Sequence, residues 1–226
     1  MSLRSKLLVR IALVLILGVA VLFIPAGTWK FWQGWAFLGV TFIPSTLAFL
    51  YFYKRDPQLV ERRLQTKETV SAQRLLIQVM RPLFLVAFLL PGLDYRWGWS
   101  RTVLRAVPLW LMLLSQVLVL GGFLLVLWVM KVNSFAARTI QVEAGQSVVS
   151  TGPYAIVRHP LYSGSVLMWL ATPLALGSYV AWPAFALLIS FYVIRLLNEE
   201  KVLRQELPGY SEYCQRTRYR LVPFVW

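Results

Sequence analysis

Long apolar runs are the feature that most restricts how this chain folds. They cover residues 7–24, 31–53, 75–93, 106–130 and 160–194, and the only charges inside them are Arg10 and Arg81. Each of the first four is close to the roughly 20 residues that a helix needs to cross about 30 Å of hydrocarbon. Because lipid offers the backbone no hydrogen-bond partners, such runs are expected to form helices.

The last run is different in length, because its 35 residues from position 160 to 194 carry no charge. It is too long for one crossing and slightly short for two, and Gly177 and Ser178 near its middle are turn formers. These features predict a tight helical hairpin. The first run is similar to a signal peptide, but no convincing cleavage site follows and further runs come after it, so it is also expected to be a span.

Composition excludes a soluble domain. Hydrophobic residues make up 58% of the 226 residues, and the mean hydropathy is +0.63, both too apolar for a water-facing surface. The single cysteine, Cys214, excludes an internal disulfide and a cysteine-based metal site, and no metal is expected. The net charge of +14 comes from basic residues between the apolar runs and at the chain ends, which favours anionic lipid headgroups over nucleic acid as the partner. Nothing in the sequence requires a protein partner.

The basic residues also predict an orientation, since cytoplasmic loops carry the excess of Lys and Arg. A cytoplasmic N-terminus places 17 of the 23 basic residues on that side, with Arg81 and Arg195 left out because they lie within or beside spans. The opposite side receives only Lys30, Arg96, Arg101 and Arg105. We therefore expect a multi-pass, all-α integral membrane protein with about six transmembrane helices and both termini in the cytoplasm. Its cytoplasmic loop, residues 54–74, is expected to include an amphipathic helix along the headgroups.

Polar residues cluster around the start and the end of the last apolar run. His159, the only histidine, directly precedes Pro160, which suits the first position of a helix whose free amides attract an anion. Arg195 and Glu199 follow the run and, four residues apart, share a helix face. If the hairpin is correct, both clusters lie at one membrane depth, on the cytoplasmic side. Tyr154 and Tyr162 add rings that stack on a base or meet a cation.

These residues carry a family resemblance. The stretch "TGPYAIVRHPLYSG" at 151–164, followed by Arg195, "NEE" and "LPGYSEYCQRTRYRLVP", strongly resembles the isoprenylcysteine carboxyl methyltransferase family. It is more distantly similar to the phospholipid methyltransferases that share the C-terminal half. The resemblance covers about residues 133–223, and it divides the chain into N-terminal helices (1–130) and a methyltransferase core (131–226).

The resemblance implies methyl transfer from S-adenosylmethionine inside the membrane, without a Rossmann domain, which agrees with the absence of a G-x-G-x-x-G motif. It also implies that the cofactor is enclosed between the hairpin, the strand-like segment before the hairpin and the C-terminal helix. It implies that Arg195 faces the substrate and that Arg195 and Glu199 are the catalytic pair. Carried over, the expected cofactor-binding residues are Gln141 (with Thr139 as the alternative), Gln146, Ser147, Val148, Val149, Tyr154, His159, Pro160, Leu161, Tyr162, Glu199 and Glu200.

The resemblance implies that the methyl acceptor is a lipid or a prenylated small molecule, and it leaves open whether the reacting group is a carboxylate or an amine. A carboxylate is already deprotonated at neutral pH, so it needs only a cation such as Arg195 to orient it. An amine must lose a proton, and Glu199, Glu200 or His159 would accept it. The lipid tail is expected to enter sideways from the bilayer, whereas the cofactor arrives from the cytoplasm.

Two other classes of protein remain as alternatives. Sterol-reductase-like membrane enzymes have a related C-terminal architecture and bind NADPH, although they are normally longer. A non-enzymatic lipid-binding or scaffold protein is the third class. For single residues the plainer interpretations are an interfacial histidine, an aromatic belt of tyrosines and a surface ion pair between Arg195 and Glu199.

Overall fold

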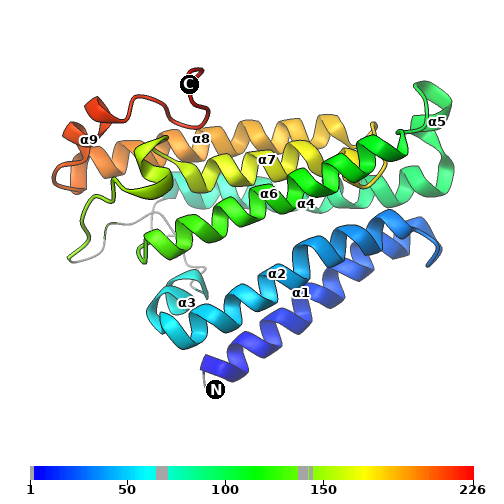
Figure 1. Cartoon of the computed structure of the whole chain (residues 1–226). Helices are drawn as coiled ribbons and strands as arrows, with labels where there is room; N and C mark the ends of the chain where they lie inside the picture. Colours follow the sequence, from blue (N-terminus) through cyan, green and yellow to red (C-terminus); the bar gives the residue numbers. More distant parts are fainter. Residues whose placement is uncertain (1–2, 65–70, 137–141, 143–144) are drawn as a thin grey trace.

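The protein is a bundle of helices. The computed structural model describes residues 3–64, 71–136, 142 and 145–226, and every regular element in these residues is a helix (Figure 1). Four helices are long and apolar enough to cross a membrane, and they carry the first four apolar runs. They are α1 (Leu3–Ala26), α2 (Trp32–Arg55), α4 (Ser71–Trp97) and α6 (Leu109–Val132).

The last apolar run forms two helices, α7 (Pro160–Ala175) and α8 (Trp182–Glu206), which pack against each other. The turn between them contains Gly177, whose φ of +73° few other residues adopt, and Ser178, whose hydroxyl accepts the N–H of Ala181 at 3.2 Å. With 16 residues, α7 is only about 24 Å long. By contrast, α8 continues beyond the apolar run, so its last turns carry charged residues.

A short amphipathic helix, α3 (Pro57–Leu64), follows α2, within the loop where the sequence predicts one. The Asp56 carboxylate accepts the N–H of Leu59 at 3.0 Å and so caps it. Leu59 and Val60 are buried against Phe52 and Met130. The remaining short elements are α5 (Trp99–Val103), the 3₁₀ turn η1 (Gly152–Ala155) and α9 (Tyr210–Arg216).

Glycines allow α6 and α7 to approach closely. A Cβ added to Gly122 would lie 2.6 Å from the carbonyl oxygen of Gly164, and one added to Gly164 would lie 2.7 Å from that of Gly122. Small residues at helix contacts let backbones approach each other, as is common in membrane bundles. This contact fixes α7, and therefore the residues at its start, against α6.

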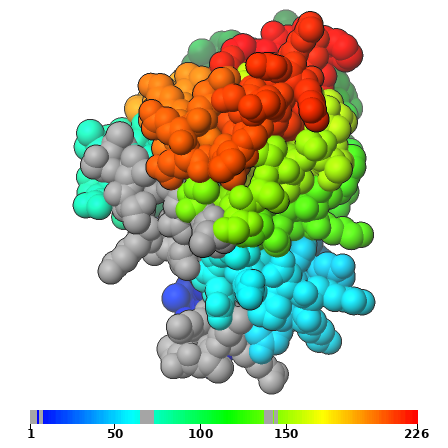
Figure 2. Space-filling model, turned by 90° about the vertical axis from the view of Figure 1, so that its left-hand side faces the viewer, coloured from blue at the N-terminus to red at the C-terminus, as the bar shows by residue number. Residues whose placement is uncertain are grey.

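The long helices run alternately between two ends of the molecule, and α3 and α9 lie at the end where α2, α6 and α8 finish (Figure 1). The C-terminal segment folds back onto the start of α7 at this end. The N–H groups of Arg158 and His159 donate to the carbonyls of Tyr219 and Arg220, at 2.8 and 3.0 Å. Figure 2 views the molecule from this side, where the end of α8, α9 and the segment before α7 form a continuous surface.

Candidate functional site

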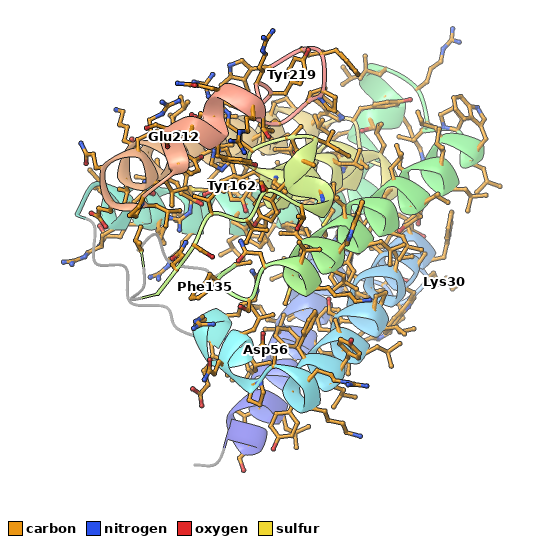
Figure 3. The ribbon with its side chains drawn as sticks, turned by 60° about the vertical axis from the view of Figure 1, so that its left-hand side comes forward. Lys30, Asp56, Phe135, Tyr162, Glu212 and Tyr219 are labelled. Atoms are coloured by element: carbon orange, nitrogen blue, oxygen red, sulfur yellow. The ribbon has the colours of Figure 1, made fainter. Side chains whose placement is uncertain are left out.

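A cavity of about 490 Å³ lies among the helices at this end of the protein. Its walls come from α4, α7, α8 and α9, together with η1, residues 146–149 and Arg63 of α3. Its volume falls within the roughly 300–1,000 Å³ that is typical of small-molecule sites. In Figure 3, Tyr162 and Phe135, which both line the cavity, lie far from Lys30 at the opposite end of the bundle.

One part of the cavity is polar and is built around Tyr154 of η1. The Tyr154 hydroxyl accepts a hydrogen bond from Nδ2 of Asn133 at 2.9 Å, and its carbonyl accepts one from the Tyr213 hydroxyl at 2.7 Å. Burial raises the pKa of Tyr154 to about 12, so its hydroxyl stays protonated at neutral pH. The turn begins at Gly152, which has a φ of +59° and packs against Val132 at the end of α6.

His159 lies immediately before α7 and is only 4% exposed. Burial is the main cause that lowers its pKa to about 4; Arg158 and Arg220 add to the lowering, whereas Glu200 opposes it. The imidazole is therefore neutral at physiological pH. Its Nε2 lies 3.3 Å from the Tyr210 hydroxyl. A buried, neutral histidine in a cavity wall differs from the exposed interfacial residue of the plainer interpretation.

One face of α8 points into the cavity and presents Tyr192, Arg195 and Glu199. The Tyr162 hydroxyl of α7 donates to Oε2 of Glu199 at 2.5 Å. Arg195 is only 7% exposed, and its Nη1 donates to Oε1 of Gln73 on α4 at 3.1 Å. Arg195 is therefore a buried residue of the cavity wall, whereas the plainer interpretation expects it on the surface.

The next residue, Glu200, points elsewhere. Its carboxylate pairs with Nη1 of Arg158, with Nε of Arg220 at 2.7 Å and with Nη2 of Arg204 at 3.2 Å. The side chains of Arg158 and Glu200 are 6% and 5% exposed. Glu200 is thus the centre of a cluster of arginines that joins α8 to the start of α7 and to the C-terminal segment.

The other part of the cavity is apolar and aromatic. The face of α4 that lines it carries Ile77, Met80, Arg81 and Phe84, at the spacing of neighbouring helix turns. From Phe84, aromatic rings continue through Trp169 to Tyr192, with ring centroids 6.4 and 4.5 Å apart, and then to Tyr162 at 4.5 Å. The cavity therefore changes from polar to apolar along its length, and Arg195 and Glu199 belong to the helix that forms part of both walls.

Most residues that the sequence singles out line this cavity. They are Gln146, Ser147, Val148, Val149, Tyr154, His159, Leu161, Tyr162, Arg195 and Glu199. Pro160 and Glu200 are not among its lining residues, since Pro160 is the first residue of α7 and Glu200 faces the arginine cluster. Gln141 and its alternative Thr139 lie outside the described residues. The segment before the hairpin, which the resemblance makes strand-like, contains no strand at its described residues 142 and 145–159.

Several lining residues were not predicted. Tyr210 and Tyr213 are letters of the motif "LPGYSEYC", so the motif itself was a signal for them. Arg81 is a charge within an apolar run, and ionisable residues in spans commonly mark functional sites. Gln73, which holds Arg195, gave no signal because it is 122 residues away along the chain.

Among the residues that the structure describes, no group of three or more His, Cys, Asp or Glu side chains is placed to hold a metal ion. A bundle with four candidate membrane spans and a cavity with polar and aromatic lining residues defines the class of this protein: a multi-pass membrane protein with an internal cavity.

Comparison with known proteins narrows the class to a family. The chain is 31% identical over 157 residues to protein-S-isoprenylcysteine O-methyltransferase B of Arabidopsis thaliana, which covers 68% of this chain and 74% of that protein. The family described as phospholipid methyltransferase matches residues 110–208. The chain belongs to the isoprenylcysteine carboxyl methyltransferase family, as the motifs between residues 151 and 223 predicted.

A solved structure shares the fold. It is that of the eukaryotic intramembrane Ras methyltransferase ICMT (isoprenylcysteine carboxyl methyltransferase), with a TM-score of 0.59 and 19% sequence identity; the match covers 96% of this chain and 74% of that one. A Delta(14)-sterol reductase of Mus musculus is 33% identical over 94 residues, which is 39% of this chain. The matched stretch spans only about a fifth (22%) of the reductase.

Proposed function

We propose that the protein transfers a methyl group from S-adenosylmethionine to the carboxylate of an isoprenylcysteine-like acceptor within the membrane. The observation that carries this proposal is the cavity, which joins a polar part to an aromatic part along one face of α8. A water-soluble cofactor and a lipid-like acceptor need two such neighbouring environments. Family membership supports the reaction type.

The polar part of the cavity suits the cofactor. A carboxylate, Glu199, is present for ribose hydroxyls or for a cationic centre, and the rings of Tyr154, Tyr162 and Tyr210 are placed to contact a base or a sulfonium. Gln146 to Val149 add their backbone groups. When bound, S-adenosylmethionine supplies an activated methyl group, and the residues of the cavity position the two reactants and exclude water from them.

Arg195 is the group that holds the acceptor carboxylate in this proposal. Its planar guanidinium donates two parallel hydrogen bonds to a carboxylate, and Gln73 keeps it in place. A carboxylate acceptor needs no base. Glu199 then serves to position the cofactor, and Tyr162 orients Glu199 by its 2.5 Å hydrogen bond. The lipid tail of the acceptor would lie against Met80, Phe84 and Trp169 and would enter sideways past α4, where Phe84 is 45% exposed.

A second candidate is N-methylation of a phospholipid, which the family match over residues 110–208 favours. An amine acceptor must lose a proton, and two cavity groups are able to take it. Glu199 lines the cavity as a carboxylate, and His159 is neutral at physiological pH. The two candidate functions differ in the role of Arg195, because only a carboxylate acceptor needs this residue as an anchor.

The hairpin of α7 and α8 is also part of the proposal, as the fifth and sixth crossings beside the four candidate spans. Both termini and the polar part of the cavity then face the cytoplasm, in agreement with the bias of basic residues. Cys214, the only cysteine, tests this orientation, because it lies on α9 at the same end as the cavity. A membrane-impermeant thiol reagent should label it only after the cells are opened, and labelling in intact cells would reverse the orientation.

The function itself is tested by binding and by turnover. Calorimetric titration of the detergent-purified protein should detect S-adenosylhomocysteine and not NADPH. Radiolabelled methyl groups should then appear, in a base-labile ester, on a small isoprenylcysteine acceptor. Binding of NADPH instead would favour a reductase, label in a phospholipid amine would favour the second candidate, and binding of neither cofactor would favour a lipid-binding protein.

A further inference from the structure

A second hollow lies on the outer surface of the bundle, between α2 and α6. It has a volume of about 460 Å³. We call this hollow the α2–α6 groove. Its lining residues are Pro44, Leu47, Ala48, Tyr51 and Phe52 of α2 and Leu124, Leu127, Trp128 and Lys131 of α6. Along each helix these positions follow the three- and four-residue spacing of one face. The groove is thus formed by two apolar faces that do not close on each other.

Both walls of the groove belong to candidate membrane spans, so a groove on their outer surface opens toward lipid. It extends along α2 from Pro44 to Phe52, which is about 12 Å at the rise of a helix. Most of its lining is hydrocarbon or aromatic. Trp128 and Tyr51 are about half exposed, at 48% and 47%, and rings of this kind favour the level of the headgroups. These features suit one acyl chain of a phospholipid lying with its headgroup at the cytoplasmic end.

Charge selects the kind of headgroup. Lys131, near the end of α6, lines the groove and is exposed. The last turn of α2 brings Lys54 and Arg55 to the same end, where both are exposed. None of the three has an ion pair or a side-chain hydrogen bond within the part of the chain that the structure describes. Two acids lie nearby, Asp56, which caps α3, and exposed Glu61, so the three basic residues outnumber the carboxylates.

We propose that the α2–α6 groove binds one anionic phospholipid, with an acyl chain between the two helices and its phosphate at Lys131. The balance of charge at the headgroup end is positive, and each Lys or Arg near a membrane surface attracts anionic lipid. A zwitterionic phospholipid fills the same groove with its chain but gains less from the charges. The groove is separate from the cavity that holds Arg195 and Glu199, and it shares no lining residue with it.

The groove and the cavity are nevertheless connected through the end of α6. A Cβ on Gly152, at the start of η1, would lie 3.2 Å from Val132 and 3.6 Å from Nε1 of Trp128, so η1 rests on a wall of the groove. Asn133, two residues after Lys131, donates to the Tyr154 hydroxyl in the cavity. A lipid that holds the end of α6 against α2 therefore steadies the residues around Tyr154.

A connection through α3 runs in parallel. Phe52 of the groove packs with Leu59 and Val60 of α3 and with Met130 of α6. Arg63 of α3 donates to the carbonyl of Ala136 at 2.9 Å, and both of these residues line the cavity. The second part of the inference, which rests on the proposed function, is that the bound lipid raises cofactor affinity.

Native mass spectrometry of the detergent-purified chain tests the lipid site. Dioleoyl phosphatidylglycerol and dioleoyl phosphatidylcholine have the same acyl chains, and the first should be retained in preference, as one molecule. Lys131→Gln should reduce that preference about fivefold, the effect of one basic residue near a membrane surface. The control Lys201→Gln, which removes another exposed lysine at the same end, should leave it unchanged. Equal retention of the two lipids, or equal loss in both variants, would overturn the proposal.

Three further measurements separate the parts of the inference. Ala48→Phe fills the groove and should remove the bound lipid; an unchanged lipid count in the folded variant would place the lipid elsewhere. Glycerol phosphate should not compete, and competition would identify a site for free anions. Finally, phosphatidylglycerol should strengthen S-adenosylhomocysteine binding several-fold in the parent and not in Lys131→Gln. If phosphatidylglycerol binds but the affinity for S-adenosylhomocysteine stays constant, the proposed link between lipid and cofactor binding is wrong. If S-adenosylhomocysteine does not bind at all, the proposed function fails instead.

Discussion

Two neighbouring carboxylates on α8 face different surroundings. Glu199 points into the cavity, where it accepts the hydroxyl of Tyr162. Glu200 points to the other side, where Arg158, Arg204 and Arg220 surround it. Successive residues of an α-helix are turned by about 100°, so adjacent positions belong to different faces. One helix thereby lines the cavity with one face and holds the C-terminal segment with the other.

The difference shows that the two glutamates of the motif "NEE" hold different parts of the structure. The arginines around Glu200 fix the start of α7 and the C-terminal segment, and these elements place His159 and Tyr162 in the cavity. Glu199 and Arg195 instead line the cavity, where they contact Tyr162 and Gln73. The comparison predicts that substitutions on the Glu200 side change stability, whereas those on the Glu199 side change binding or turnover.

The largest effect is expected from Glu200→Gln. Removing one partner of a buried pair leaves Arg158 without compensation, which typically costs about 3–5 kcal/mol. The thermal unfolding midpoint in detergent should fall markedly, while Glu212→Gln, which removes an exposed carboxylate from α9, should leave it nearly unchanged. If the two variants unfold alike, the arginine cluster does not stabilise the fold, and the contrast between the two carboxylates disappears.

Arg195→Lys should reduce methyl transfer about tenfold to hundredfold, because an ammonium cannot reproduce a two-bond grip on a carboxylate. The affinity for S-adenosylhomocysteine should stay within about twofold of the parent, which is about 0.4 kcal/mol. Arg204→Lys, in an exposed pair on the same helix, is the matched control and should change neither quantity. Full activity of Arg195→Lys would move the acceptor anchor to another residue and would favour an amine acceptor.

Tyr162→Phe should weaken S-adenosylhomocysteine binding about tenfold, since it removes the hydrogen bond that orients Glu199. Glu199→Gln should act in the same direction, because a carboxylate is lost from the polar part of the cavity. Both variants should unfold at the temperature of the parent to within a few degrees. Calorimetric titration measures the affinities, with Tyr219→Phe, which lies outside the cavity, as the control. Unchanged binding by both variants would show that the cofactor lies elsewhere.

The smallest effect is expected from pH. With a pKa of about 4, His159 is only about 1% protonated at pH 6, so cofactor affinity should change by less than about twofold between pH 6 and pH 8. The free energy of unfolding depends on pH in a different way. The pKa of His159 in the unfolded chain is near its ordinary value of 6.5, so as pH falls the unfolded chain binds a proton at a higher pH than the folded protein does. The contribution of the neutral ring is therefore complete above pH 6.5 and is lost as pH falls through 4.

Titration of S-adenosylhomocysteine at several pH values, beside unfolding at the same values, checks this prediction. His159→Gln is the matched variant, because it keeps a neutral polar side chain and has nothing to titrate in this range. A steep loss of affinity in the parent between pH 7 and pH 6, absent from the variant, would mean that His159 carries a charge in the site.

Much of the fold follows from local sequence. Apolar runs predicted the four candidate spans, and Gly177 and Ser178 marked the turn between α7 and α8, because these signals depend on neighbouring residues alone. The family followed from the motifs, and most of the residues that the motifs singled out line one cavity. The two α8 carboxylates show the limit: their order in the chain is plain, but the direction in which each points depends on how α8 is rotated against α7 and α9.

The α4 wall of the cavity illustrates a second limit. Arg81 stands out in its apolar run, yet a lone charge in a span either serves a site or reaches toward the headgroups, and the sequence does not separate these. The contact between Gln73 and Arg195 joins residues 122 positions apart. Such pairs are determined by the packing of α4 against α8, which no local pattern encodes.

The shortness of α7 has a consequence for the surrounding bilayer. If the hairpin crosses the membrane as proposed, a helix of about 24 Å meets hydrocarbon about 30 Å thick, and hydrophobic mismatch of this sign is relieved by local thinning of the bilayer. Thinning would lower the headgroup surface beside His159 and Arg195. An acceptor at that surface would then already lie near the depth of the cavity. The thinned bilayer would thereby help to position the acceptor for the reaction. Activity should accordingly be highest in bilayers of short-chain lipids.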